Sequence, residues 1–434
     1  MLEGVENRMR LLKLIPVCGL LVCLTGSAWG QTEWGSWRGS QDGVVKDAEL
    51  PLEWSQEKNV VFRLELPGPA GSTPVVAGER IFLTSADGDD LVLLCASTGG
   101  EILWKNKITT GNRVVREGEG NSASSSPATD GKHVWAMFGD GTLVCYSLDG
   151  EEVWAKRLQE DYGEFNIQFG MTTTPVLHKG NLYLQLIHGA WNNEPSQGLL
   201  VCLEASNGNE IWKHVRKTTA ISENKHSYAS PVVFDQGDYH YLVSHGADYV
   251  IANDLATGEE IWRCGGFNPQ NNYNEFLRFV ASPAVGPNLI VAPSAKGRSI
   301  VAIRPGGKGD ITDSEFIVWR QERGTPDVPS PIVTEGFTYL CRENGVAVCI
   351  ENRTGEVVYE ERTNGQLHRA SPVLVGDKLL FLSKQGVGTV LEAGPVFKEL
   401  GSNELGEPIS ASPVVVGKRL YLRSYKALYA IEEK

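Results

Sequence analysis

Cysteine is the residue type in this sequence with the widest chemistry, because thiols form disulfides, bind metals and act as nucleophiles. The chain has eight cysteines, and two of them lie in an apolar N-terminal stretch. Four others precede an aromatic residue by nine or ten positions: Cys95, Cys145, Cys202 and Cys349. Equivalent positions of a repeat lie too far apart for disulfides, so we predict buried free thiols. Cys341 and Cys349 fall on adjoining strands of one repeat and are the pair that could bond.

The histidines and carboxylates form no familiar catalytic or metal-binding motif. His240 and His245 are five residues apart on strand-like sequence, so their side chains should point to opposite faces. The acidic run 87–90 is too short for a calcium loop and predicts a hairpin turn. The sequence contains no His-Glu-x-x-His, Gly-x-Ser-x-Gly or Gly-x-x-x-x-Gly-Lys-Ser/Thr. We therefore predict no catalytic residue and no metal site.

The charge of the chain disfavours one class of partner. The formal net charge is −13 at pH 7. Proteins that bind nucleic acid need clustered lysine and arginine to contact phosphates, so we predict that nucleic acid is not a partner. We also predict a monomer.

The N-terminus predicts export. A basic start at residues 9–13 is followed by an apolar stretch from Leu14 to Leu24, and small residues at 28 and 30 suit cleavage before Gln31. The apolar stretch is too short to cross a bilayer. We therefore predict a signal peptide at 1–30, whether translation starts at Met1 or Met9, and a periplasmic or secreted protein without a membrane span.

The sequence after the signal peptide is built from a repeat, and the repeat determines where any binding residues lie. A serine or threonine followed by proline recurs eight times, with successive prolines 41 to 56 residues apart. The prolines are Pro74, Pro127, Pro175, Pro231, Pro283, Pro331, Pro372 and Pro413. Each copy continues with four short apolar runs separated by glycine turns, which is typical of a propeller blade. We predict an all-β, eight-bladed β-propeller of four-stranded antiparallel blades over 52–434, with residues 31–51 docking on it.

A large aromatic residue marks the fourth strand of most copies. Such rings can wedge between neighbouring blades, burying roughly 150–250 Å² each. The last copy ends without a fourth strand, so we predict that residues 59–64 supply it and close the ring. The predicted blade-docking aromatics are Phe62, Trp104, Trp154, Trp212, Trp262, Trp319, Tyr359 and Phe397.

The repeat resembles a known family. Residues 251–262 and 201–212 show its pattern, in which Thr/Asn-Gly precedes the fourth strand and its tryptophan. This pattern is similar to the pyrroloquinoline-quinone propeller family, which includes calcium-dependent quinoprotein dehydrogenases. The family also includes the non-catalytic propeller lipoprotein of the outer-membrane β-barrel assembly machinery. Residues 34–39 are similar to the opening segment of other exported propellers, and we expect Trp34 and Trp37 to dock on the blades.

The resemblance leaves three functions open. Quinoprotein dehydrogenases carry adjacent bonded cysteines near the quinone, and this chain has no Cys-Cys dipeptide. Their calcium ligands also cannot be matched to a motif here. We therefore expect a non-catalytic exported scaffold without a cofactor that binds a protein or a cell-surface polysaccharide. The alternatives are an oxidoreductase that uses pyrroloquinoline quinone with calcium, and a carbohydrate-active propeller.

The loops before each Ser/Thr-Pro are the expected binding face, because they vary while the blades repeat. They could receive a peptide or a saccharide, or they could line a hydrated channel mouth. A long insertion in the third copy adds a tryptophan for partner docking. The candidate residues are Phe169, His226, Tyr228, Arg278, Asp327, His368, Arg369 and Trp191.

Overall fold

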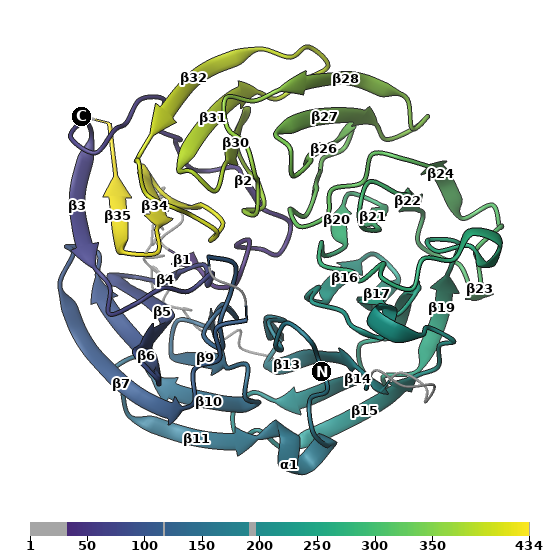
Figure 1. Cartoon of the computed structure of the whole chain (residues 1–434), viewed down its shortest axis with the longest axis horizontal. Helices are drawn as coiled ribbons and strands as arrows, with labels where there is room; N and C mark the ends of the chain where they lie inside the picture. Colours follow the sequence, from purple (N-terminus) through teal and green to yellow (C-terminus); the bar gives the residue numbers. More distant parts are fainter. Residues whose placement is uncertain (1–32, 116–117, 191–196, 434) are drawn as a thin grey trace, which may run out of the picture.

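A computed structural model describes residues 33–115, 118–190 and 197–433. Eight β-sheets are arranged in a ring around a central channel (Figure 1). This confirms the predicted eight-bladed, all-β propeller. The expected signal peptide and Trp191 lie outside the described residues. In the ranges that are described, no helix has the length and apolar character needed to cross a membrane.

Each blade consists of four antiparallel strands that run from the channel outward. Blades 1 and 2 contain β4 (Val75–Ala77), β5 (Arg80–Asp87), β6 (Asp90–Ser97), β7 (Ile102–Thr110), β8 (Ala128–Thr129), β9 (His133–Met137), β10 (Thr142–Ser147) and β11 (Glu152–Arg157). Blades 3 and 4 contain β12 (Val176–His178), β13 (Asn181–His188), β14 (Gln197–Glu204), β15 (Glu210–Arg216), β16 (Val232–Gln236), β17 (Tyr239–Gly246), β18 (Tyr249–Asp254) and β19 (Glu260–Cys264).

The second half of the ring repeats this plan. Blades 5 and 6 contain β20 (Ala284–Gly286), β21 (Leu289–Pro293), β22 (Ile300–Ile303), β24 (Ile317–Gln321), β25 (Ile332–Val333), β26 (Phe337–Cys341), β27 (Val346–Glu351) and β28 (Val357–Arg362). Blades 7 and 8 contain β29 (Val373–Val375), β30 (Lys378–Leu382), β31 (Val387–Glu392), β32 (Glu399–Glu404), β33 (Val414–Val416), β34 (Arg419–Arg423), β35 (Ala427–Ile431) and β3 (Val60–Glu65). The connections include β23 (Gly309–Asp310), α1 (Leu158–Tyr162), η1 (Ser222–Lys225) and η2 (Gln270–Asn272).

The N-terminal strand β3 closes the ring, as predicted. It pairs antiparallel with β35 and places Phe62 opposite Ala430. In Figure 1 the purple β3 lies directly outside the yellow β35. This strand covers the edge of β35, which would otherwise be open to pairing with other chains.

Aromatic rings on the outer strands pack on glycines of the next blade. A Cβ atom added at Gly258 would lie 2.4 Å from a ring carbon of Trp212. Trp104 stacks in the same way on Gly150, and its indole Nε1 donates a hydrogen bond of 2.9 Å to the Leu148 carbonyl. The glycine before the outer strand at these positions therefore provides both a positive φ and space for the neighbouring ring.

Blade 7 departs from this pattern. The register of β31 and β32 places Gly401 opposite Val390, at the position where other blades carry their aromatic residue. Phe397 precedes β32 and instead packs edge-on against Tyr359 of blade 6, with ring centroids 5.6 Å apart. The chain near Leu52 covers the gap, because a Cβ at Gly401 would lie 2.7 Å from the Leu52 carbonyl oxygen.

Residues 33–45 form a segment that we call the plug, which crosses one end of the channel. Its β1 (Glu33–Trp34) pairs with β4 of blade 1, and its β2 (Val44–Val45) runs parallel to β29 of blade 7. Between these strands, the plug makes hydrogen bonds to blades 2, 4, 6 and 8. All these contacts lie at or beyond the Ser/Thr-Pro steps that begin the inner strands, so the plug closes the end opposite the predicted binding loops.

Candidate functional site

The eight Ser/Thr-Pro residues form a closed ring of hydrogen bonds around the channel. The backbone N–H of each serine or threonine donates to the side-chain hydroxyl of the equivalent residue in the next blade, at 2.9–3.2 Å. We call this ring the hydroxyl belt. It consists of Thr73, Ser126, Thr174, Ser230, Ser282, Ser330, Ser371 and Ser412.

The belt explains why a hydroxylated residue recurs before each proline. In six blades the inner strand is the edge of its sheet, and in blades 1 and 7 the plug strands pair only with its later residues. The N–H at its start therefore has no neighbouring strand to pair with. A buried unpaired N–H is costly, and the hydroxyl of the next blade satisfies it. The sequence repeat located these residues, but the hydrogen bonds between blades appear only once the ring is assembled.

The belt encloses a cavity of about 280 Å³ on the channel axis. All eight belt residues line it, and Trp37 of the plug lies among the lining residues at the closed end. The indole Nε1 of Trp37 donates a hydrogen bond of 3.3 Å to the Ser412 hydroxyl. The cavity is therefore blocked at the plug and opens toward the loops that precede the inner strands.

Five of the predicted binding residues line this cavity: Phe169, Tyr228, Arg278, Asp327 and Arg369. The guanidinium of Arg278 lies 4.9 Å from the centre of the Phe169 ring, and the ring centroids of Phe169 and Tyr228 are 6.0 Å apart. The backbone N–H of Phe169 donates to the Tyr228 hydroxyl at 3.2 Å. These contacts hold an aromatic wall at the mouth of the cavity, and its Arg278 is ion-paired with the buried Glu223 at 2.8 Å.

Two glutamates at the mouth were not predicted. Arg369 forms ion pairs with Glu119, at 3.0 Å, and with Glu343. Lys384 also contacts Glu119, at 3.0 Å. Burial opposes ionisation of Glu119, but hydrogen bonds from Arg369 and Lys384 outweigh it and keep the pKa of this carboxyl below its usual value. The two acids therefore neutralise the cations of this side of the mouth.

The two predicted histidines lie beneath the cavity surface. His226 and His368 are both buried and are not among the lining residues. The ring of His226 contacts the Gly189 carbonyl, with its Nε2 at 2.8 Å from the oxygen. Burial lowers the pKa of His368 to about 4, so this side chain is neutral at physiological pH. Both histidines precede inner strands, but their side chains turn into the protein.

The six cysteines in the described ranges are buried and free, and they are not among the residues that line the cavity. The thiols include Cys341 and Cys349, the pair that could have bonded. Burial raises the pKa of Cys95, Cys145 and Cys202 to about 12, which leaves their thiols protonated and poorly nucleophilic.

The cavity residues do not fit calcium-bound pyrroloquinoline quinone. Within the described ranges, no three side chains of the histidine, cysteine, aspartate and glutamate types gather into a possible metal site. Calcium needs several oxygen ligands, usually including carboxylates. Glu119 and Glu343 at the mouth are already held by Arg369, Asp327 accepts a hydrogen bond from the Lys296 backbone N–H, and the floor offers hydroxyl groups. The site is better suited to a ligand that accepts hydrogen bonds.

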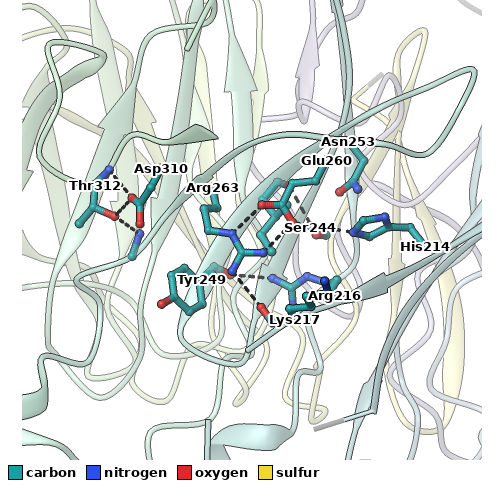
Figure 2. A network of polar contacts seen from close by, with 12 residues as sticks. His214, Arg216, Lys217, Ser244, Tyr249, Asn253, Glu260, Arg263, Asp310 and Thr312 are labelled. Atoms are coloured by element: carbon teal, nitrogen blue, oxygen red, sulfur yellow. Dashed lines mark hydrogen bonds and ion pairs between the residues drawn. The ribbon is translucent and has the colours of Figure 1, made fainter. Parts of the chain in front are cut away.

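A separate polar network joins the outer strands of blades 3 and 4 (Figure 2). Arg263 donates to both carboxylate oxygens of Glu260, at 2.5 and 2.7 Å, and lies over the Tyr249 ring. Arg216 of β15 is buried and donates to the Tyr249 carbonyl of blade 4 at 2.9 Å. Because its bonds cross from one blade to the next and its residues are not those lining the belt, we assign this network a structural role.

Comparisons with known proteins agree with this architecture. The family model described as outer membrane protein assembly factor BamB matches residues 44–264 and 248–433. No curated protein sequence matches the chain. The crystal structure of BamB from Moraxella catarrhalis is 15% identical and has a TM-score of 0.60, covering 86% of this chain and 97% of its own.

Enzymes share the same fold. Quinohemoprotein alcohol dehydrogenase from Comamonas testosteroni is 11% identical with a TM-score of 0.64, over 92% of this chain and 80% of its own. A europium-containing methanol dehydrogenase is 12% identical with a TM-score of 0.66, over 91% of this chain and 90% of its own. At such identities the structural matches establish the fold alone, so function must be argued from the cavity.

Proposed function

Since the chain belongs to the propeller family of the outer membrane protein assembly factor BamB, we propose that it is an exported, non-catalytic scaffold that binds a protein partner. The partner contacts the open mouth of the central cavity. A polysaccharide partner was equally compatible with the sequence. The family relationship favours a polypeptide, and the experiment below separates the two.

One observation carries the proposal: the channel is closed by the plug at one end and open at the other, where aromatic residues and arginines gather. Tyrosine and arginine are enriched among the residues that dominate binding energy at protein interfaces. Phe169, Tyr228 and Arg278 are already held by mutual contacts in the unbound protein. Such preorganisation lowers the entropic cost of binding.

Site-specific photo-crosslinking in cells of the source organism tests this function. A benzophenone amino acid replaces Val328, which lines the cavity near its mouth. The matched control replaces Val396, which is 70% exposed and lies before the outer strand of blade 7. We expect Val328 to yield one discrete adduct that proteases digest, and we expect Val396 to yield none.

Two results would contradict the proposal. An adduct that resists proteases and is degraded by glycosidases would assign the mouth to a polysaccharide. Adducts formed only at the control position would move the interface to the outer strands. Recombinant protein mixed with pyrroloquinoline quinone and calcium should show no dye reduction with alcohols, and turnover in that assay would instead support the oxidoreductase.

A further inference from the structure

The hydroxyl belt has hydrogen-bond donors that the protein does not use. Each belt oxygen accepts a backbone N–H, yet none of the eight hydroxyls donates to a protein acceptor in the part of the chain that the structure describes. Every belt residue is at most 6% exposed and lines the cavity. Eight O–H groups are therefore available to a molecule on the channel axis.

These hydroxyls are strengthened as donors by the bonds that they accept. A hydroxyl whose oxygen accepts an N–H is polarised, and chains of hydrogen bonds reinforce one another in a low dielectric. The Ser412 oxygen accepts both the Ser371 N–H and the Trp37 indole N–H, so its lone pairs are occupied. The floor of the cavity thus favours a ligand that accepts hydrogen bonds over one that donates them.

Two buried arginines flank the belt without lining the cavity, Arg38 on the side of the plug and Arg423 on the side of the loops. Arg38 follows Trp37 in the plug, and Arg423 donates to both oxygens of Ser72, the residue before the belt threonine of blade 1. Each is at most 2% exposed, and among the described residues neither donates to a carboxylate. Burial lowers the pKa of Arg38 to about 10 and that of Arg423 to about 9. Both remain charged at neutral pH and attract an anion.

We infer that the belt binds the terminal carboxylate of a polypeptide that enters from the loop end. This inference rests on the proposed function and names the part of the partner that is recognised. A carboxylate only accepts hydrogen bonds, which matches a floor of donors. Because the plug blocks the far end, a chain that advances along the axis must end in the cavity. Its terminus would lie above Trp37.

Calorimetric titration with short peptides tests this inference on the full mature chain. The probes are N-acetyl-pentaalanine with a free carboxylate, the same peptide as a carboxamide, and sodium acetate. A hydrogen bond to a charged group contributes about 1.5–3 kcal/mol, so we expect the acid to bind at least about tenfold more tightly than the amide. Acetate lacks the chain that contacts the walls and should bind more weakly than the peptide acid.

A matched pair of variants at Thr174 locates the effect at the belt. Its hydroxyl accepts the longest belt hydrogen bond, 3.2 Å from the Ser126 nitrogen, so its loss should disturb the ring least. T174V keeps the shape of the side chain but removes the hydroxyl, and we expect it to reduce the preference for the acid by about tenfold. T174S keeps the hydroxyl and should preserve the preference, with both variants checked by thermal unfolding.

The inference would be overturned by equal binding of acid and amide, by binding of neither peptide, or by an unchanged preference in a folded T174V protein. Acetate that binds as tightly as the peptide acid would assign the belt to small carboxylates and not to a chain terminus. The acid and amide comparison needs no variant, so it stands even if T174V fails to fold. A protein adduct from Val328 without acid preference would retain the proposed function and reject only this inference.

Discussion

At the scale of single residues, the contact between a ring and a glycine joins each outer strand to the next blade. Gly258 has a φ of +74° and meets Trp212, whereas Gly237 in the same blade has a φ of +58° and no atom within 4 Å of an added Cβ. Both glycines have a left-handed backbone, but only Gly258 is covered by a side chain, the Trp212 ring. They therefore form a matched pair for measuring the packing contribution.

We predict that G258A destabilises the protein substantially more than G237A. A left-handed backbone costs alanine about 1–2 kcal/mol, which applies to both variants. Overpacking against Trp212 adds about 1–3 kcal/mol in G258A alone. Urea unfolding followed by circular dichroism measures the difference. Equal losses of unfolding free energy in the two variants would show that packing of the Trp212 ring does not require the absence of a side chain at residue 258.

Residues that belong to the local repeat could be predicted from the sequence. Residues whose contacts come from distant segments of the chain could not. The proline steps and most ring positions follow from the repeat. Phe397 was placed on the outer strand, but the register of β31 and β32 puts Gly401 at the ring position and leaves Phe397 before β32. Glu119 was missed because its partner Arg369 is 250 residues away in the sequence. The orientation of His226 and His368 depends on packing that the loop sequence does not reveal.

At the scale of elements, β3 and the plug are two N-terminal segments with different tasks. Ring closure by β3 was predicted from the sequence, because the last copy of the repeat lacked a fourth strand. The plug was expected only to dock its two tryptophans. Its path from blade 1 to blade 7 could not be read from sequence, because strands as short as β1 and β2 carry no periodic signal.

Deleting each segment should give a distinct pattern of amide hydrogen exchange. Removal of residues 60–65 exposes the edge of β35 and should accelerate exchange there by at least about tenfold, since its partner strand is lost. Removal of the plug, residues 33–45, should accelerate exchange of the belt amides and spare β35. Mass spectrometry of peptides from β35 and from the belt distinguishes the two. Faster exchange of β35 in the plug deletion would show that the two segments are not independent.

At the scale of the whole molecule, the eight blades form a channel that the plug blocks at one end, so a ligand can enter only from the loop end. The eight-bladed fold, its closure by β3 and the family were predicted from the repeat and are confirmed. The closed end was not predicted, since it needs the plug to reach blades that are far apart in sequence. Because that end is blocked, we propose that the partner binds at the mouth, which is lined by Phe169, Tyr228 and Arg278.

The structure of the complex trapped through Val328 tests that placement most directly. We expect a polypeptide segment between the aromatic wall and Arg369, with its chain end above Trp37 and within the belt. A partner bound to the outer strands, with only solvent inside the belt, would contradict it.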